Sequence, residues 1–415
     1  MEYRMSQQMR MTVPARLFST LAALLLAGCT SIHRNPVPVA DMDRAVIAGM
    51  PGIRDWGDEP SREFQRDLMR SVIDEQAARA PGDPALAEIS ALVLSGGGSN
   101  GAFGAGYLVG WSETGTRPTF KLVTGVSTGA LIAPLAFLGS DYDQQLEAMY
   151  TQVKSKDIYK LRSPFMMLKR DSLAVTDPLK SLIEIVVDDT LLQAIAIEHR
   201  RGRRLFVGTT NLDAQRLVVW NMGAIAASGH PQAAALFREV LLASASIPVA
   251  FPPVYIEVEV DGLPYDEMHV DGGVIAEFFL WGATVDVSKA IDALDVGHRS
   301  TAMYIIRNSQ IDPEPRSVPR KLVPIASRSM ITLLKAVAMG DLFRLWSLSE
   351  RDGVDFNYIG IPPDHPETTT SSFDPSELAR LFKLGREIAT GERPWRKEPP
   401  AFLEWTERDL GDARQ

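Results

Sequence analysis

Short apolar runs alternate with longer segments of helical spacing along most of the chain after residue 88. The short runs predict buried strands at 91–94, 120–124, 204–208, 302–306 and 354–359. The longer segments predict helices at 102–111, 130–138, 144–153, 178–187, 232–243, 325–350 and 375–390. Because strands alternate with helices, the pattern indicates an α/β domain with a mostly parallel central sheet.

One uncharged stretch, residues 122–140, is nearly long enough to cross a bilayer. Three glycines and Pro134 interrupt it, and its first part has the pattern of a strand followed by a turn. We therefore expect a buried strand, turn and helix here rather than a membrane span.

The first 28 residues have the pattern of a targeting segment. Three arginines precede an apolar run that is short for a transmembrane helix and ends in Leu26-Ala27-Gly28-Cys29. This ending resembles the lipobox of bacterial lipoproteins, which implies that Cys29 becomes the N-terminus and carries acyl chains such as palmitate. The resemblance thus implies a lipid-anchored protein of the bacterial cell envelope. Because Thr30 rather than Asp follows the cysteine, the resemblance favours the outer membrane over the inner membrane. The alternative is a plain secretory signal peptide with an incidental cysteine.

The composition excludes several classes of protein. Of 415 residues, 45% are hydrophobic and 23% are charged, which excludes a mainly disordered chain, a collagen and a polytopic membrane protein. The formal net charge of −9 gives no electrostatic reason to bind nucleic acid. Cys29 is the only cysteine, so no intramolecular disulfide can form. The histidines lack metal-ligand spacing, so we expect neither a metal nor another cofactor.

The distribution of prolines suggests domain boundaries. Residues 29–88 are rich in proline and contain one predicted helix at 61–79 with Ser61 as its N-cap, which predicts a tether and N-terminal extension. Four prolines within 312–324 predict a linker. The expected division is a signal peptide at 1–28, this extension, an α/β domain at 89–310 and a mainly helical C-terminal extension at 311–415.

A glycine-rich loop, Ser95-Gly96-Gly97-Gly98-Ser99-Asn100-Gly101, separates a predicted strand from a predicted helix. Its glycines fit the dinucleotide pattern G-x-G-x-x-G, but the next strand ends without the acidic residue that this pattern requires. No Lys-Ser or Lys-Thr follows, which excludes a P-loop. The loop is therefore either a structural tight turn or a set of backbone amides that face an anion at a helix N-terminus.

Two further motifs contain a candidate nucleophile and a candidate base. Gly125-Val126-Ser127-Thr128-Gly129 is a G-x-S-x-G between a predicted strand and a predicted helix, a context that exposes a serine hydroxyl on a sharp turn. Asp271-Gly272-Gly273 follows a short apolar pair and, taken alone, indicates an ordinary turn.

The three motifs in this order resemble the patatin-like phospholipase family over residues 89–310. The segments 209–213 and 243–253 also resemble that family. The resemblance implies a three-layer α/β fold with Ser127 as nucleophile on a strand-turn-helix elbow, Asp271 as base, and an oxyanion hole made by the amides of Gly97 and Gly98. Two positions depart from the family and put the substrate preference in doubt: Asn100 stands where Arg or Lys is usual, and Glu277 stands where Asn is frequent.

The implied activity is that of a serine lipid acyl hydrolase of the phospholipase A, lysophospholipase or esterase type. Its implied partners are a phospholipid or another acyl-ester lipid as substrate and the membrane that holds the anchor. The alternative is a non-catalytic lipid-binding or scaffold lipoprotein of the envelope. A histidine could also complete a triad, because His298 and His365 follow Asp271 and His269 precedes it by two residues. The sequence leaves the oligomeric state open.

The segment 154–170 carries six cationic residues and one acidic residue. Within it, Phe165-Met166-Met167-Leu168 follow Pro164, and no helical or strand period divides these four apolar residues between a buried and an exposed face. Such a segment is either core with a solvated rim of cations or an interfacial lid over the site.

Overall fold

The computed structural model describes residues 34–78, 88–163, 170–280, 300–365, 373–391 and 395–400. The predicted signal peptide, Cys29, the apolar segment Phe165–Leu168 and His298 lie outside these described residues.

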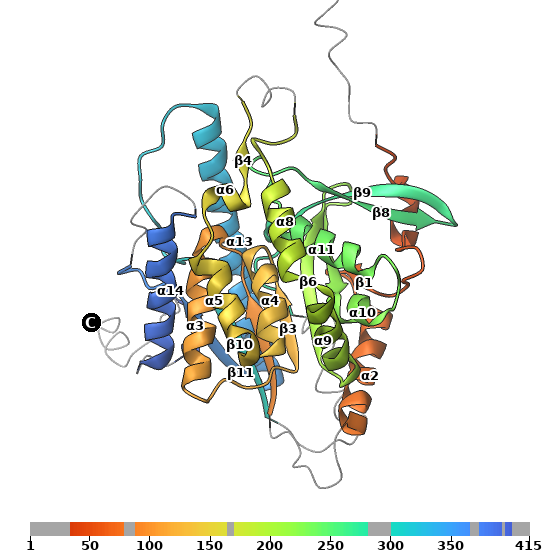
Figure 1. Ribbon diagram of the computed structural model, residues 1–415, viewed down its shortest axis with the longest axis horizontal. Coiled ribbons are helices and arrows are strands. Elements are labelled where there is room, and N and C mark those ends of the chain that lie inside the picture. The colour runs from red at the N-terminus through yellow and green to blue at the C-terminus, as the bar shows by residue number, and fades with distance from the viewer. Residues whose placement is uncertain are drawn as a thin grey trace, which may run out of the picture.

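A nine-stranded sheet forms the middle layer, and its order is β1-β7-β6-β3-β2-β10-β11, with the hairpin β8–β9 joined to β6 through β9 (Figure 1). β6, β3, β2, β10 and β11 run parallel, whereas β1, β7 and β9 join antiparallel. The strands are β1 (Arg54–Trp56), β2 (Glu88–Leu94), β3 (Leu122–Gly125), β6 (Arg204–Asn211), β7 (Arg216–Asn221), β8 (Val254–Val260), β9 (Leu263–Asp271), β10 (Ser300–Arg307) and β11 (Asp355–Gly360). This arrangement confirms the predicted α/β fold with a mostly parallel sheet.

Helices cover both faces of this sheet (Figure 1). One face carries α3 (Gly101–Glu113), α4 (Thr128–Leu138), α5 (Asp143–Thr151), α9 (Asp189–Arg200), α10 (Met222–Ala227), α11 (Ala233–Ser244) and α14 (Pro375–Thr390). The other face carries α2 (Arg62–Ala78) and α13 (Leu322–Asp352). Two short helices, α6 (Ser155–Ile158) and α8 (Asp177–Val186), and the strand pair β4 (Lys160–Leu161) and β5 (Ala174–Val175) lie towards one end of the sheet.

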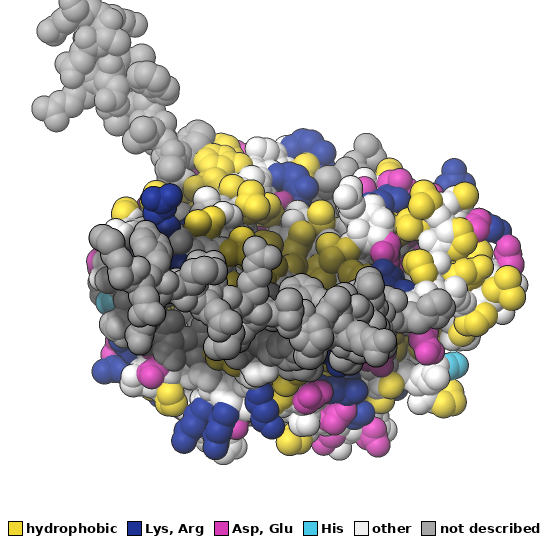
Figure 2. Space-filling model, turned by 90° about the horizontal axis from the view of Figure 1, so that it is seen from above, with side chains coloured by type: hydrophobic (Ala, Val, Ile, Leu, Met, Phe, Trp, Pro, Cys, Tyr) yellow, Lys and Arg dark blue, Asp and Glu magenta, His cyan; other side chains and the backbone are white. Residues whose placement is uncertain are grey.

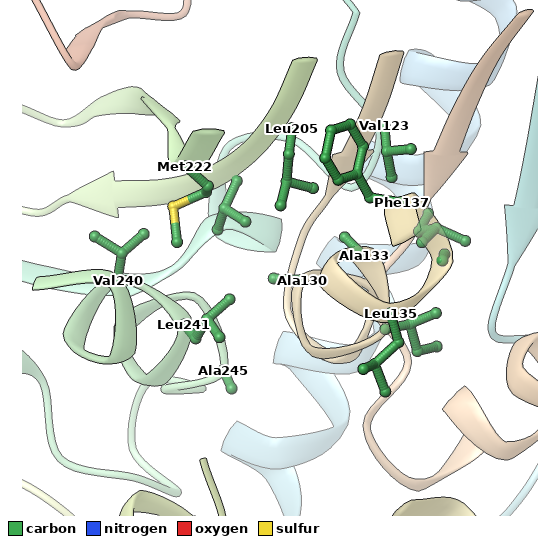
Figure 3. Packing of buried hydrophobic residues seen from close by; sticks show 14 of the residues in the cluster. Val123, Ala130, Ala133, Leu135, Phe137, Leu205, Met222, Val240, Leu241 and Ala245 are labelled. Carbon is green, nitrogen blue, oxygen red and sulfur yellow. The ribbon is translucent and has the colours of Figure 1, made fainter. Parts of the chain in front are cut away.

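Alternating side chains on the strands explain the three layers, because successive residues of a strand point to opposite faces. Leu205 and Val207 of β6 join the core beneath α4 and α11, whereas Phe206 between them packs with Phe64 of α2. Figure 3 shows the first of these cores, with side chains of α4 and α11 meeting Leu205 and Val123. The uncharged segment 122–140 is thus a buried strand, turn and helix, as predicted.

Each strand and helix predicted from the hydrophobic pattern is present, with ends shifted by a few residues. The predicted N-cap of the first long helix is also confirmed, because the Phe64 N–H donates to Ser61 Oγ over 3.0 Å.

The predicted N-terminal tether is wrong for the part of 29–88 that the structure describes. β1 pairs antiparallel with β7, and Arg34 forms ion pairs with Asp213 and Asp266 at 2.6 and 2.8 Å. Arg54 Nη2 donates to Glu267 Oε1 over 2.9 Å. The described part of this segment is therefore packed along the domain by strand pairing and ion pairs.

The predicted C-terminal boundary at 310 is also corrected. β11 pairs in parallel with β10, and α14 packs along α3. The strand predicted at 354–359 is β11, and it forms its backbone hydrogen bonds with β10 at the edge of the sheet. The segment after 310 is therefore part of the same fold.

Candidate active site

Ser127 lies at the turn between β3 and α4. Its backbone has φ 55° and ψ −125°, a positive-φ conformation that residues with side chains rarely adopt. Its N–H donates to Ser244 Oγ over 3.0 Å, and the Ser244 hydroxyl donates to the Gly208 carbonyl over 2.7 Å. These two bonds fasten the strained turn to β6.

The outer glycines of the G-x-S-x-G motif permit this turn because each lies against backbone atoms. A Cβ on Gly125 would stand 2.4 Å from the Gly129 carbonyl oxygen, and one on Gly129 would stand 2.4 Å from the Leu94 carbonyl oxygen. Side chains at these positions would push α4 away from the strands. The motif therefore has the strand-turn-helix geometry that the sequence predicts.

Asp271 is the last residue of β9, and it lines the same cavity as Ser127, which follows β3. It stands opposite Thr209 in the β6–β9 pairing. Its carboxylate accepts the Gly273 N–H at 2.8 Å. Burial raises the pKa of Asp271 to about 7, although the nearby Ser127 hydroxyl and then the Gly273 N–H lower it. The structure thus brings together the candidate nucleophile and the candidate base.

The glycine loop lines the same cavity as Ser127 and Asp271 through Gly96, Gly97 and Gly98. Gly97 has φ 154°, and a Cβ on it would stand 2.0 Å from the Asn308 carbonyl oxygen. This position therefore requires glycine. The loop passes through the short turn η2 (Gly98–Asn100) into α3, so its amides lie at a helix N-terminus.

Asn308 holds the glycine loop from the end of β10. Its N–H donates to Ser95 Oγ over 2.9 Å, and its Nδ2 donates to the Ser95 carbonyl over 2.8 Å. Asn308 is buried. No motif surrounds it in the sequence, which is why sequence analysis did not find it.

Glu277 adds a second buried carboxyl group to the site. A Cβ on Gly96 would lie 2.9 Å from Glu277 Oε2, and one on Gly273 would lie 2.6 Å from Oε1, so this carboxyl group sits between the two glycine motifs. Burial and then the charge of Asp271 raise the pKa of Glu277 to about 8, whereas Arg307 and the Gly96 amide lower it. Near pH 7 Glu277 is therefore mainly protonated while Asp271 is partly ionised.

α13 positions the segment that carries Glu277. Asp341 of this helix accepts the N–H of Glu277 at 2.8 Å and the N–H of Phe278 at 3.3 Å. Arg344 pairs with Asp341 at 2.8 Å. Residues beyond the predicted domain boundary thus support the site, and neither Asp341 nor Arg344 belongs to a recognisable motif.

The site opens into a cavity of about 510 Å³, a size suited to a small-molecule ligand. Most of the lining side chains away from Ser127 are apolar, including Leu131, Met149, Ile183 and Val186. Leu161 and other residues of the basic segment 154–163 also line it. Phe165–Leu168 lie outside the described residues, so core and interfacial lid both stay as predictions for that segment.

No histidine lines the cavity in the described part of the chain. His269 is fully buried and hydrogen-bonds to Thr209 at 2.9 Å and Glu267 at 3.0 Å, and burial lowers its pKa. His365 is partly exposed. In the same described residues, no group of three or more His, Cys, Asp or Glu side chains is arranged to hold a metal ion.

Residues 92–283 match the model of the patatin-like phospholipase family. This stretch contains the glycine loop, the Ser127 turn and the Asp-Gly-Gly motif. The chain therefore contains a patatin-like phospholipase domain, as the sequence predicts. A comparison with curated proteins found no match.

Several solved structures are similar to this chain at low identity. VipD from Legionella pneumophila is 15% identical over 73% of this chain and 66% of its own, with a TM-score of 0.32. Human GIVD cytosolic phospholipase A2 is 10% identical over 75% of this chain and 52% of its own, with a TM-score of 0.30. The type III effector protein ExoU is 13% identical over 74% and 52%, with a TM-score of 0.23. The chain thus covers less than two thirds of the length of each structure.

Proposed function

We propose that this protein is a serine lipid acyl hydrolase of the phospholipase A, lysophospholipase or esterase type, with Ser127 and Asp271 as a catalytic dyad. The observation that carries the proposal is that these two buried side chains lie at the wall of one largely apolar cavity, where the Ser127 hydroxyl lowers the pKa of Asp271. A serine is a weak nucleophile and needs a base within hydrogen-bond reach. The apolar lining suits the acyl chain of a lipid ester.

In the proposed reaction, Ser127 Oγ attacks the ester carbonyl carbon while Asp271 accepts the hydroxyl proton. The N–H groups of Gly97 and Gly98 stabilise the oxyanion, an effect of about 2.7–4 kcal/mol per donor in other enzymes. The tetrahedral intermediate then breaks the bond to the leaving alcohol, which receives the proton from Asp271. Asp271 next deprotonates a water molecule that attacks the acyl-Ser127 ester, and the fatty acid leaves as the proton returns to Ser127.

The first test measures hydrolysis of a soluble p-nitrophenyl ester and of defined phospholipids. We expect Ser127→Ala to reduce turnover to background and Asp271→Asn to reduce it by several orders of magnitude, because the amide cannot accept the serine proton. Ser99→Ala is the matched control, since Ser99 lines the same cavity without a proposed role. A fluorophosphonate should label Ser127.

Two results would contradict this proposal. A main fluorophosphonate adduct at another serine would reassign the nucleophile. A folded protein without turnover that depends on Ser127 would favour the lipid-binding scaffold instead.

We further propose that acyl chains on Cys29 anchor the protein in the bacterial cell envelope, at the outer membrane. The ending Leu26-Ala27-Gly28-Cys29 supports this, together with the absence of any other cysteine from the sequence. Several acyl chains give stable attachment, whereas one gives only marginal attachment. The overall charge of −9 repels an anionic leaflet, so the anchor or a local basic surface must hold the protein.

A further inference from the structure

The N-terminal half of α13 is an apolar helix that projects from the core (Figure 1). No residue of 322–337 is buried, whereas Ala338, Leu342 and Leu345 further along the helix pack into the core. Leu322 is 83% exposed and Leu333 is 61% exposed. Among the described helices, α13 is the one that is long and apolar enough to cross a membrane by length and composition.

The length of the projecting half argues against a membrane crossing. The projecting residues 322–337 extend about 24 Å at 1.5 Å per residue, short of the roughly 30 Å of a hydrocarbon core. The rest of the helix cannot follow into a bilayer because it holds Asp341 against the active-site segment. A projecting apolar helix of this kind is suited to the plane of a membrane interface.

Two sides of this half-helix have different neighbours. Ile331 and Leu334 line the cavity that also contains Ser127. Leu322, Ile325 and Leu333 are spaced to share another side of the helix, and all three are exposed. The projecting half of α13 therefore presents one apolar side to the proposed substrate cavity and another to solvent.

Basic side chains accompany this apolar surface. Arg316, Arg320 and Lys321 precede the helix and are exposed. Residues 312–335 contain five Lys or Arg against two acidic residues, and residues 154–163, several of which line the cavity, contain four against one. Figure 2 shows the face as a hollow with hydrophobic side chains and with Lys and Arg side chains near it. Cations gathered on one face of an acidic protein complement an anionic surface.

The start of the described chain lies at the same end of the molecule (Figure 1). The five steps along the chain from Cys29 to Arg34 span at most about 18 Å when fully extended. An acyl anchor on Cys29 would therefore hold this end of the protein close to the bilayer.

We propose that Leu322, Ile325 and Leu333, together with Arg316, Arg320 and Lys321, form a docking face that seats the protein on an anionic lipid bilayer. The cavity then opens towards the lipid, and an acyl chain reaches Ser127 along Ile331 and Leu334. The inference rests on the proposed function for the identity of the substrate, but docking itself requires no turnover.

The test measures cosedimentation of the mature chain, from residue 29 onward, with vesicles of phosphatidylcholine, with and without phosphatidylglycerol. This chain lacks the apolar run of residues 1–28 and carries Cys29→Ser to remove the anchor and Ser127→Ala to remove hydrolysis, so binding is read independently of the proposed activity. Ile325→Glu is compared with Ile73→Glu, because Ile325 is 49% and Ile73 is 51% exposed. Ile73 lies on α2, at the other end of the molecule (Figure 1).

We expect Ile325→Glu to weaken vesicle binding by roughly ten-fold or more while Ile73→Glu leaves it unchanged. Arg320→Gln with Lys321→Gln should weaken binding to anionic vesicles by roughly five-fold per cation, and added salt should remove this difference. With Ser127 restored, the same variants should hydrolyse a soluble monomeric ester at the wild-type rate.

Three results would overturn the proposal. Equal effects of Ile325→Glu and Ile73→Glu would remove the role of α13. A protein that becomes monomeric with Ile325→Glu but still binds vesicles would make this face an interface between two copies. Protection of 322–337 from protease added to either side of a sealed vesicle would indicate a membrane span.

Discussion

At the scale of single residues, two carboxyl groups with different environments lie beside one serine. Burial raises the pKa of Asp271 to about 7, although the nearby Ser127 hydroxyl lowers it. Glu277 is equally enclosed and lies near the charge of Asp271, which contributes to its pKa of about 8. Because one group ionises before the other, the site can hold a charged base and a neutral acid at the same time.

The activity should therefore pass through a maximum between about pH 7 and pH 8. We expect kcat/KM for a soluble ester to rise as Asp271 ionises, because the base must be unprotonated, and to fall as Glu277 becomes charged beside the glycine loop. Glu277→Gln should keep the rise and remove the fall. Glu314→Gln, at another carboxyl group of the cavity lining, is the control. A fall that persists in Glu277→Gln would contradict this role.

The same two groups should make stability depend on pH. Their pKa values are raised in the folded protein, so the folded state binds more protons than the unfolded state between about pH 4 and pH 8. The free energy of unfolding should therefore decrease as pH rises through this range, by up to about 1.4 kcal/mol per pH unit for each group. Urea unfolding at several pH values measures this slope, and Glu277→Gln should reduce it. An unchanged slope would contradict the assignment.

At the scale of elements, α3 and α14 are packed so closely that glycine separates their backbones. A Cβ on Gly385 of α14 would stand 2.1 Å from the Phe103 carbonyl oxygen, and one on Gly106 of α3 would stand 2.0 Å from the Phe382 carbonyl oxygen. α3 begins at the glycine loop. A helix that lies beyond the family match therefore supports the helix that leads out of the proposed oxyanion hole.

This packing predicts opposite effects for two glycine substitutions in helices. Gly385→Ala should lower the free energy of unfolding by about 1–3 kcal/mol, because the added methyl group overpacks the contact. Gly340→Ala in α13 should raise it by about 0.5–1 kcal/mol, because open space surrounds that position and alanine favours helix. Urea unfolding of both variants checks the pair. A stable Gly385→Ala protein would mean that α14 is free to move away from α3.

At the scale of the whole molecule, both ends of the described chain are tied into one sheet, and the proposed attachment to lipid lies at one end. β1 and β11 occupy the two edges of the strand order. The docking face and the first described residue lie towards the same end of the molecule (Figure 1). An anchor and a docking face at this end would together fix the orientation of the cavity.

The anchor is tested by Cys29→Ser and Thr30→Asp. We expect Cys29→Ser to block incorporation of radiolabelled palmitate, because the side chain that carries the acyl chains is absent, and the same substitution in a chain without residues 1–28 should leave the protein free of membranes after a salt wash. Thr30→Asp should keep the label and move the protein to the inner membrane. Ser127→Ala is the control, and it should leave both label and location unchanged. Palmitate in the Cys29→Ser protein would contradict the anchor.

The sequence by itself determined the parts that depend on local chemistry. Buried strands appear as short apolar runs, and the turns at Ser127 and Asp271 need small residues next to them, so both could be found without the fold. The resemblance of these motifs to one family then indicated which side chains meet, and the structure places Ser127 and Asp271 in the lining of one cavity.

Only the tertiary structure decided the parts that depend on partners distant in the chain. The short strand β1 has no distinctive pattern, and its place beside β7 follows from the shape and hydrogen-bonding edge of the assembled sheet. Polar residues such as Asn308 and Asp341 become important because backbone groups from other segments need partners inside the protein. The raised pKa of Glu277 has the same origin, because desolvation and the nearby charge of Asp271 exist only once the chain has folded.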